Sequence, residues 1–262
     1  MNSICENFQD SISPESRIGI ISVLRTQGAP EDEISEILEL ADHDPAKLKR
    51  LMIRKRFGEP NAYLRGHVSY FGREFKIDRR CYIPDAYAQE LVERVLADAT
   101  AGGRGLEVGT GCGWVSISLV SERPDLTMSA SDIDTATLQL AQENASRHGV
   151  NITFFESNFA DDVTITEPDF IIANVPYGGD AEYTDRELEE RPQMPPIAIC
   201  DPEGPTAPLV QLIESIQGRG WRCKVYLETG YLDADRLRPV TDICSSSEHV
   251  RNGDFGYLVL KL

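Results

Sequence analysis

The tetrapeptide Asn174-Val175-Pro176-Tyr177 carries the groups needed to hold a planar nitrogen acceptor. The Asn174 side-chain oxygen and the Val175 carbonyl can both accept hydrogen bonds from one NH2 group. Tyr177 offers an aromatic face on which that group can stack, and Pro176 makes the turn rigid. The lone pair of an amide or aryl-type nitrogen is delocalised, so an enzyme that methylates it must hold and aim the nitrogen. The tetrapeptide favours methyl transfer to such a nitrogen, with an ordinary proline turn as the alternative.

A glycine-rich segment, Glu107-Val108-Gly109-Thr110-Gly111-Cys112-Gly113, is the second place where chemistry is expected. Its alternate glycines let the backbone approach a ligand that side chains would otherwise block. The spacing is G-x-G-x-G, whereas dinucleotide-binding turns have G-x-G-x-x-G, so a nicotinamide cofactor is the weaker interpretation. Cys112 is expected to pack behind the ligand as a small residue and to play no nucleophilic role.

Two further segments indicate which ligand the glycine-rich turn binds. Asp132 ends a predicted strand about twenty residues later, where a carboxylate can accept both hydroxyls of a ribose. Asn158 and Phe159 follow the next predicted strand and could hold an adenine through an amide and an aromatic face. Together with Glu107 ahead of the glycines, these residues suit S-adenosylmethionine as the cofactor. A glycine-rich turn in some other α/β fold is the alternative.

The elements that must position these residues alternate between helix and strand after Pro84. Hydrophobic periodicity is the basis for these assignments. Helices are expected over residues 86–97, 114–121, 135–148 and 207–216, and strands over residues 105–108, 126–131, 152–155, 170–173, 224–227 and 256–262. Such alternation predicts an α/β fold with a doubly wound, mostly parallel sheet. Both candidate sites then fall at the carboxyl ends of the strands, where ligands bind in such sheets.

The chain before Pro84 has a different character. Residues 14–57 carry apolar stripes at helical spacing, and Ser13-Pro14, Ala29-Pro30-Glu31-Asp32 and Asp44-Pro45 are typical helix starts. Residues 63–82 are rich in aromatic and β-branched residues around two glycines, which indicates a hairpin. The expected organisation is a helical, substrate-recognising domain over residues 1–62, a hairpin linker over residues 63–84 and a methyltransferase domain over residues 85–262.

Composition and charge limit the possible partners. The 262-residue chain has a net charge of −17, and its acidity counts against nucleic-acid binding, which depends on neutralising phosphates. No apolar stretch approaches the length of a membrane span and the amino terminus is polar and acidic, so no membrane association and a cytoplasmic location are expected. Its six cysteines are scattered without a C-x-x-C pair, and we expect no metal site.

These residues together make the chain resemble a known family, the protein-(glutamine-N5) methyltransferases that modify release factors (the HemK/PrmC type). The resemblance runs through Gly58-Glu59-Pro60, Ala62-Tyr63, Gly66, Ile83-Pro84, residues 107–113, Ser121-Glu122-Arg123-Pro124-Asp125, Asp132, Asn144-Ala145, the Asn-x-Pro-Tyr site and Leu227-Glu228-x-Gly230. It implies a seven-stranded, Rossmann-like class I methyltransferase sheet after a small helical domain. It also implies that residues 109–113, Asp132, Phe159 and Asn174 contact S-adenosylmethionine. The substrate amide would then lie against residues 174–177, with Asn174, Pro176 and Tyr177 as the catalytic set.

The chain departs from the family pattern around the substrate entrance. Asp85 follows Pro84 where a basic residue is usual, Asn158 replaces an acid, and Val175 replaces the first proline of Asn-Pro-Pro-Tyr. The glycine-rich segment expected after that site is reduced to residues 201–205, and Phe255-Gly256-Tyr257 stands where an arginine is usual.

Three alternatives to a release-factor methyltransferase therefore stay open. The first is an N-methyltransferase that tailors a small metabolite or peptide. The second is an adenine N6 methyltransferase of nucleic acids, which the aliphatic Val175 would suit and the acidic charge opposes. The third is a binding protein that has kept the fold without the reaction, against which the intact Asn174 and Tyr177 count. For the enzymes, in-line transfer needs neither a metal nor a covalent nucleophile.

Overall fold

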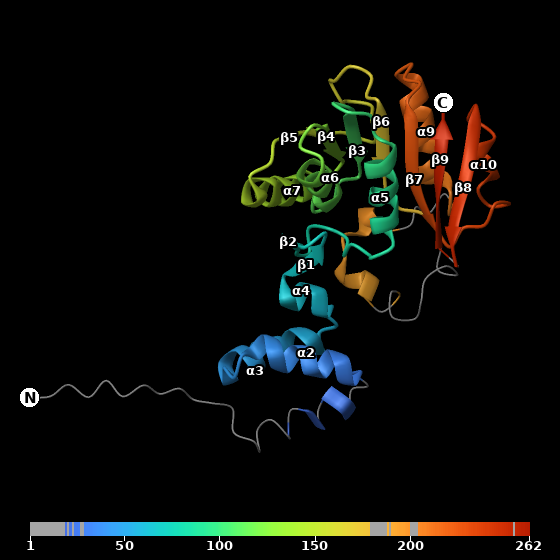
Figure 1. Cartoon of the computed structure of the whole chain (residues 1–262). Helices are drawn as coiled ribbons and strands as arrows, with labels where there is room; N and C mark the ends of the chain where they lie inside the picture. The colour runs from blue at the N-terminus through green and yellow to red at the C-terminus, as the bar shows by residue number, and fades with distance from the viewer. Residues whose placement is uncertain are drawn as a thin grey trace, which may run out of the picture. The chain divides into compact units, whose positions relative to one another are not determined.

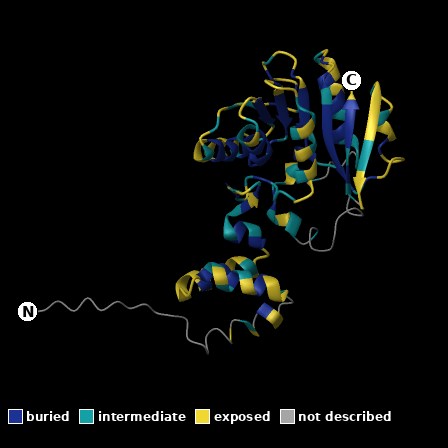
Figure 2. Ribbon diagram, in the orientation of Figure 1, coloured by how far each residue is buried: buried dark blue, intermediate teal, exposed yellow. Residues whose placement is uncertain are grey.

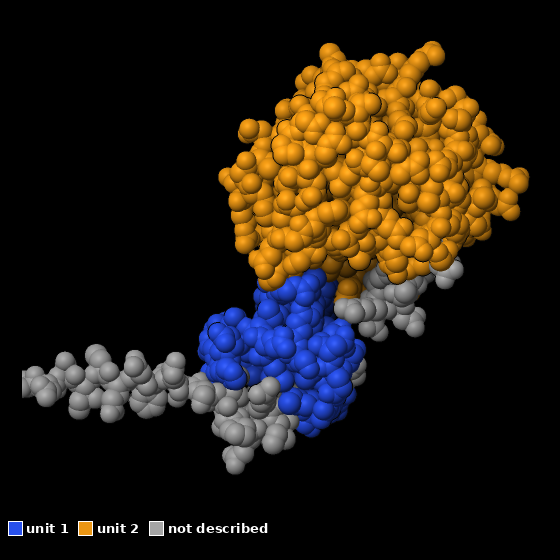
Figure 3. All heavy atoms as spheres, in the orientation of Figure 1, with its two compact units in different colours: residues 1–66 blue, residues 67–262 orange. Residues whose placement is uncertain are grey.

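The computed structural model describes residues 19, 21–22, 24–26, 29–178, 188, 190–199, 204–253 and 255–262. The chain divides into two compact units, Met1–Gly66 and His67–Leu262, which Figure 3 colours separately. The helix start expected at Ser13-Pro14 and residues 201–203 of the reduced glycine segment lie outside the described residues. Within the described ranges, no helix combines the length and the apolar character that crossing a membrane requires.

The first unit is helical, as its apolar stripes predict. It contains α2 (Glu31–Ala41), α3 (Pro45–Arg56) and the short α4 (Asn61–Arg65), which ends at Gly66 in the left-handed conformation. The Asp44 carboxylate caps α3 by accepting hydrogen bonds from the backbone N–H groups of Ala46 and Lys47 at 2.8 and 3.0 Å. A small core of its own holds the unit together and consists of Leu24, Ile34, Ile37, Ala41, Leu48, Leu51 and Leu64.

The second unit is built on a seven-stranded, mostly parallel sheet, as expected for a class I methyltransferase (Figure 1). Its spatial order is β5-β4-β3-β6-β7-β9-β8. The strands are β3 (Arg104–Val108), β4 (Thr127–Asp132), β5 (Ile152–Glu156), β6 (Phe170–Ala173), β7 (Lys224–Gly230), β8 (Ser246–Asn252) and β9 (Phe255–Lys261). The five strands from β5 to β7 are parallel to their neighbours, and β9 is antiparallel to both β7 and β8.

Strand β8 is the one strand of this sheet that hydrophobic periodicity did not predict. It lies at the edge of the sheet, and most of its residues are exposed or partly exposed (Figure 2). An edge strand whose two faces are both exposed to solvent lacks the alternation of apolar and polar residues from which strands are predicted. The four-residue helix α10 (Arg238–Thr241) was likewise missed, because one turn is too short to show a period.

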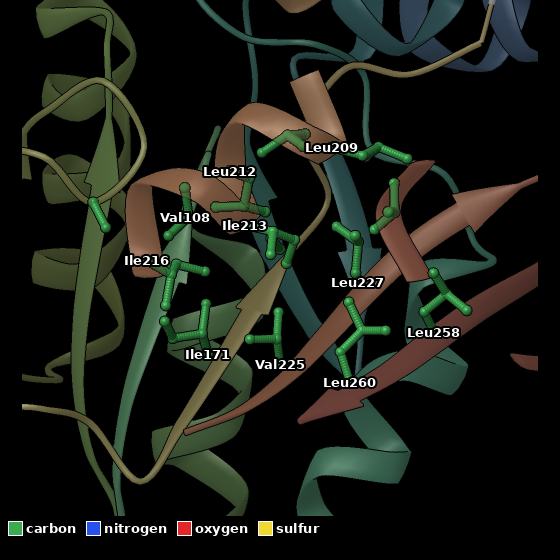
Figure 4. Packing of buried hydrophobic residues seen from close by; sticks show 14 of the residues in the cluster. Val108, Ile171, Leu209, Leu212, Ile213, Ile216, Val225, Leu227, Leu258 and Leu260 are labelled. Atoms are coloured by element: carbon green, nitrogen blue, oxygen red, sulfur yellow. The ribbon is translucent and has the colours of Figure 1, made fainter. Parts of the chain in front are cut away.

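Helices cover the sheet and close its core. They are α5 (Ala88–Asp98), α6 (Trp114–Glu122), α7 (Thr135–His148) and α9 (Ala207–Gly218), with 3-10 turns η2 (Arg191–Gln193) and η3 (Pro196–Ala198) before α9. Figure 4 shows Leu212, Ile213 and Ile216 of α9 directed at apolar side chains of the sheet. The strand side of this fully buried cluster includes Val108, Ile171, Val225, Leu227, Leu258 and Leu260.

The hairpin β1 (His67–Tyr70) and β2 (Arg73–Lys76), which the sequence placed in a linker, falls in the second unit. Tyr70 stacks on Trp114 with ring centroids 4.3 Å apart. The Asn144 amide of α7 binds the backbone of Lys76 twice, accepting from its N–H at 2.8 Å and donating to its carbonyl at 2.9 Å. These contacts make the hairpin part of the methyltransferase unit.

Candidate active site

A cavity of about 430 Å³ opens at the carboxyl ends of the parallel strands. Nine of the predicted site residues line it: Gly109, Gly111, Asp132, Asn158, Phe159, Asn174, Val175, Pro176 and Tyr177. The cavity has two parts. The "glycine end" is formed by Gly109, Gly111, Asp132, Asn158 and Phe159, and the "asparagine end" is formed by residues 174–177 with Tyr87, Tyr231 and Phe255.

The glycine end begins with a turn whose shape depends on glycine. Gly109, Gly111 and Gly113 all have positive φ, at 73°, 56° and 82°. The N–H groups of Gly109 and Thr110 donate to the Ser131 carbonyl at 2.9 and 3.0 Å, which ties the turn to the end of β4. The turn is thereby fixed mainly by backbone hydrogen bonds.

Asp132 stands at the end of β4 and faces the cavity, as predicted for a ribose-binding carboxylate. Its Oδ2 accepts a hydrogen bond from the Gly111 N–H at 3.0 Å, and its Oδ1 accepts from the Asp134 N–H at 3.1 Å. Burial raises the pKa of Asp132, whereas these backbone donors favour its charged form. Each carboxylate oxygen keeps a further lone pair for a ligand hydroxyl.

Four residues that the sequence assigned to the cofactor set, Glu107, Thr110, Cys112 and Gly113, do not line the cavity. Glu107 is buried behind the turn, where its Oε2 accepts from the Thr110 hydroxyl at 2.8 Å, the Ser116 N–H at 3.0 Å and the Ser116 hydroxyl. Burial raises the pKa of Glu107 to about 7 despite these donors. Glu107 therefore holds the turn from behind.

Cys112 and Gly113 also serve the packing of the turn. The Cys112 carbonyl accepts a hydrogen bond from Asn144 at 2.8 Å, and its buried thiol has a pKa raised by the adjacent Cys81 and by burial. A Cβ at Gly113 would stand 3.1 Å from the Cβ of Ala141 on α7. This glycine therefore permits a close helix contact, and the thiol of Cys112 is a packed group.

The segment after β5 completes the glycine end. Phe159 adopts a positive φ of 48°, which is uncommon for an aromatic residue, and the Ser131 hydroxyl donates to its carbonyl at 3.0 Å. Asn158 is exposed and Ser157 is buried. The structure thus brings an exposed amide and a partly buried ring to the cavity beside Asp132.

The asparagine end follows β6, all four residues of which are buried. Asn174 is exposed at the cavity, Val175 is 3 % exposed, and Pro176 and Tyr177 are partly buried. A Cβ at Gly109 would lie only 3.2 Å from Cγ1 of Val175. The two predicted sites therefore touch, with the Asn-Val-Pro-Tyr turn packed directly on the glycine-rich turn.

Tyr177 is held by a partner that the sequence did not assign to the site. Its hydroxyl donates to Oε1 of Glu228 at 2.9 Å, and Glu228 is only 1 % exposed at the carboxyl end of β7. Burial and the negative charge of Asp85 raise the pKa of Glu228 well above its ordinary value, while Tyr177 and Asn174 lower it. A charged residue directly after the apolar run Val225-Tyr226-Leu227 was the signal that could have drawn attention to it.

Aromatic side chains form the outer wall of the asparagine end, and the sequence did not predict them. Tyr87 stacks on Phe255 with centroids 3.9 Å apart, and Tyr231 meets Phe255 edge to face at 5.3 Å. Asp85, which lines the same cavity, accepts hydrogen bonds from the N–H groups of Tyr87 at 2.8 Å and Ala88 at 3.2 Å. Residues 195–199, before α9, also line it.

The arrangement can bind two planar groups side by side. The glycine end offers backbone, a carboxylate and an aromatic ring, which suits a nucleoside, and the asparagine end offers hydrogen-bond acceptors beside tyrosine. In the described ranges, no group of three or more His, Cys, Asp or Glu side chains is placed to hold a metal ion. The residues present therefore fit a methyl donor with a nucleoside part and a planar nitrogen acceptor.

Comparisons with known proteins agree with this geometry. Residues 84–190 match the family described as Methyltransferase small domain. A release factor glutamine methyltransferase of Neisseria gonorrhoeae is 35% identical over 167 residues, which are 62% of this chain and 60% of that protein. One from Koribacter versatilis is 31% identical over 212 residues, which are 77% of this chain and 74% of that protein.

A comparison of folds gives the same class. A methyltransferase from Pyrococcus furiosus superposes with a TM-score of 0.52 at 15% identity and covers 81% of this chain and 98% of its own. At this identity the likeness shows the fold alone. It agrees with the class I methyltransferase sheet expected from the sequence.

Proposed function

Because the chain belongs to the release factor glutamine methyltransferase family, we propose that it transfers a methyl group from S-adenosylmethionine to a glutamine side-chain nitrogen of a peptide chain release factor. The observation that carries the proposal is the packing of the Asn174 turn on the glycine-rich turn, through Val175 and Gly109. A methyl donor and a planar amide acceptor would then lie next to each other. The cytoplasmic location expected from the sequence fits this substrate.

The glycine end would hold the cofactor, which supplies the electrophilic methyl group. Asp132 would accept the ribose hydroxyls, and Asn158 and Phe159 would bind the adenine, since these side chains face the same cavity. Gly109 and Gly111 would leave room for the ligand against the backbone. Glu107 would act indirectly, by holding the turn through Thr110 and Ser116.

The asparagine end would hold and aim the acceptor. The Asn174 oxygen and the Val175 carbonyl would accept the two N–H hydrogens of the substrate amide. Tyr177 would stack on the amide plane, and Pro176 would keep the turn rigid. Acceptors placed where positive charge develops on the nitrogen stabilise the transition state, and a fixed approach of the two reactants supplies much of the remaining rate enhancement.

A second candidate function has one observation in its favour. The entrance is lined by the stacked rings of Tyr87 and Phe255 beside Asp85, whereas the resemblance leads us to expect a basic residue at position 85 and an arginine near residue 255. An acidic, aromatic entrance would suit a cationic or aromatic acceptor, such as a small metabolite or peptide. This alternative keeps the same cofactor and the same acceptor chemistry.

The test is to incubate the chain with methyl-labelled S-adenosylmethionine and, separately, purified release factors, a metabolite extract and bulk RNA. We expect label in the release factor and loss of that label when its acceptor glutamine is replaced by alanine. Label in a small molecule alone would contradict the release-factor proposal and support the second candidate function, methylation of a small metabolite or peptide. Label in RNA alone would contradict both.

We further propose that the first unit recognises the substrate and that cofactor binding belongs to the second. The separate cores of the two units support this division. A chain beginning at His67 should bind the cofactor with the affinity of the full chain but lose transfer to the release factor. A chain beginning at Ile83 should be less stable, because it lacks the Tyr70–Trp114 stack and the bonds to Asn144. Full transfer activity in the chain from His67 would refute the division.

A further inference from the structure

Glu228 is a buried carboxyl group for which the proposed reaction has as yet no role. It is 1 % exposed, and in the described chain no Lys, Arg or His forms an ion pair with it. Its Oε1 accepts the Tyr177 hydroxyl at 2.9 Å, while its Oε2 has no completed hydrogen bond among the described residues. A buried carboxyl with one oxygen unsatisfied is costly to keep, so its retention needs an explanation.

The strand is shaped to admit the tyrosine that reaches this carboxyl. A Cβ at Gly230 would stand 2.2 Å from the Tyr177 hydroxyl oxygen and 2.6 Å from its ring, so only glycine leaves room for the side chain. Gly230 also has a positive φ of 50°, and the pairing of β7 with β9 shifts register between Glu228 and Gly230. Both residues therefore contribute to the place where Tyr177 lies.

Asn174 lies beside the same carboxyl, since the parallel pairing of β6 with β7 ends at Ala173 and Leu227, the residues before Asn174 and Glu228. Its side chain is close enough to favour the charged form of Glu228, although it does not complete a hydrogen bond to Oε2. An asparagine amide can present either its oxygen or its NH2 group to a ligand. A carboxylate only accepts hydrogen bonds, so an ionised Glu228 attracts the NH2 group and leaves the oxygen for the cavity.

We propose that Glu228 is a positioning residue that anchors the Tyr177 ring through its hydroxyl and turns the Asn174 amide so that its oxygen faces the acceptor nitrogen. This inference rests on the proposed function, because it assigns Asn174 and Tyr177 to the acceptor. Glu228 does not line the cavity and acts through these two side chains. Without it, the amide of Asn174 would be free to present donors where the reaction needs an acceptor.

The groups around Glu228 predict a pH dependence. Asp85 before α5 opposes its ionisation, Tyr177 and Asn174 after β6 favour it, and Tyr257 pairs with it on β9. The charged residues of α5 that reach β7, Arg94 and Asp98, lie at the other end of the strand. A protonated Glu228 could donate to the Asn174 oxygen and withdraw it from the substrate. Transfer should therefore rise with pH as Glu228 loses its proton.

Strand β7 supplies a matched control at its other end. There the Tyr226 hydroxyl donates to Oδ2 of Asp98 at 3.0 Å, so a second tyrosine–carboxylate pair is present. Asp98 differs from Glu228 because Arg94 and Lys224 neutralise it at 3.1 and 3.2 Å, and it lies outside the cavity lining. Asp98→Asn removes the same kind of charge from α5, where it binds a tyrosine of the same strand, without touching the acceptor end.

The experiment compares Glu228→Gln, Glu228→Asp and Asp98→Asn with the parent chain in single-turnover transfer to the release factor, at saturating cofactor and over a range of pH. Glu228→Gln should lower the rate at least tenfold at the high-pH plateau of the parent chain, leave cofactor affinity within twofold and remove the rise with pH. Glu228→Asp should restore part of the pH dependence. Asp98→Asn should keep the parent rate and profile.

A second measurement needs no acceptor. NMR titration of chains labelled with 13C at the glutamate carboxyls, with Glu228 assigned from Glu228→Gln, should show a higher pKa for Glu228 in Tyr177→Phe and a lower one in Asp85→Asn. If the parent chain methylates none of the acceptors, the proposed function fails. The titration still tests whether Glu228 is bound by Tyr177 and lies close to Asp85. An unchanged Glu228 pKa in Tyr177→Phe overturns the inference. So does a Glu228→Gln chain with the parent's rate and pH profile, or equal losses in Glu228→Gln and Asp98→Asn.

Discussion

The glycine end and the asparagine end of the cavity are built by different means. At the glycine end the carboxyl groups are satisfied locally: Asp132 accepts from two backbone N–H groups, and Glu107 accepts three hydrogen bonds from Thr110 and Ser116. At the asparagine end the turn is held by side chains from distant strands, and Glu228 receives one completed hydrogen bond, from Tyr177. The glycine end is therefore held mainly by local hydrogen bonds, many of them to the backbone, whereas the asparagine end depends on side-chain contacts between residues that are distant in the sequence.

This difference indicates which functions each end can perform. The shape of a turn that is fixed by backbone hydrogen bonds does not depend on the methyl acceptor, so the glycine end can bind the same cofactor with different acceptors. The asparagine end depends on contacts between distant side chains, and three departures from the family pattern, Asp85, Val175 and Phe255, line the cavity there, whereas Asn158 lies at the glycine end. We therefore expect mutations at the two ends to separate cofactor binding from transfer.

The largest effect should come from Asn174→Ala at the asparagine end. It removes an acceptor that matters most when positive charge develops on the nitrogen, and loss of one such preorganised partner lowers turnover by roughly 10²–10³-fold. Cofactor affinity should fall far less than the rate, because the glycine end, which supplies the rest of the cofactor site, is intact. Single-turnover transfer and calorimetry measure the two quantities. If Asn174→Ala transfers at the parent rate, the turn has only a structural role.

Glu107→Gln should change how the free energy of unfolding depends on pH, because it removes the buried carboxyl behind the glycine end. The pKa of Glu107 is raised from 4.5 to about 7, so between these values the folded chain keeps a proton that the unfolded chain has lost. The free energy of unfolding should therefore fall by roughly 3 kcal/mol as pH rises through this window and level off above it. Glu107→Gln should lack this part of the fall.

Denaturant unfolding of both chains between pH 4.5 and pH 8 measures that contribution. Asp132 and Glu228 also have raised pKa values and contribute a fall of the same sign in both chains. The relevant quantity is therefore the difference between variant and parent at each pH. A difference that stays constant over the window would show that Glu107 is ionised throughout.

Asp132→Ala should weaken the cofactor by about tenfold or more, because hydrogen bonds to a charged group contribute roughly 1.5–3 kcal/mol. The rate at saturating cofactor should change little, which is the reverse of the Asn174→Ala result. Calorimetry on the folded variant gives the affinity. Unchanged affinity would remove Asp132 from the ribose site and weaken the separation between the two ends.

Tyr177→Phe should have the smallest effect, a loss of transfer of about tenfold, which corresponds to the lower end of what a hydrogen bond to a charged group contributes. The ring remains to stack on the acceptor, and the hydroxyl that donates to Glu228 is lost. Tyr177→Ala is the matched comparison and should be far more damaging, because it removes the ring. Equal losses in the two variants would mean that the hydroxyl, and not the ring, is what the acceptor needs.

Much of the glycine end could be predicted from the sequence because its determinants are local. A turn with three positive φ angles needs glycines at fixed spacing, and a carboxylate at the end of the next parallel strand must lie beside it. The sheet itself follows from apolar strands such as β6, whose four residues are all buried. The mostly parallel sheet, the glycine-rich turn and the place of Asp132 could therefore be predicted from the sequence, whereas the strand order and β8 came from the structure.

Only the tertiary structure decided what surrounds the acceptor. Tyr177 and Glu228, which form a hydrogen bond, are 51 residues apart in the sequence. Tyr87 and Phe255, whose rings stack, are farther apart still. Hydrophobic periodicity cannot predict such pairs, because the local structure of one residue does not depend on the identity of the other. Glu107 is a different case: its partners Thr110 and Ser116 are near in the sequence, but only the structure shows that they hold its side chain behind the turn and outside the cavity lining. Local backbone geometry can be read from spacing, but contacts between distant side chains depend on how the strands and helices pack.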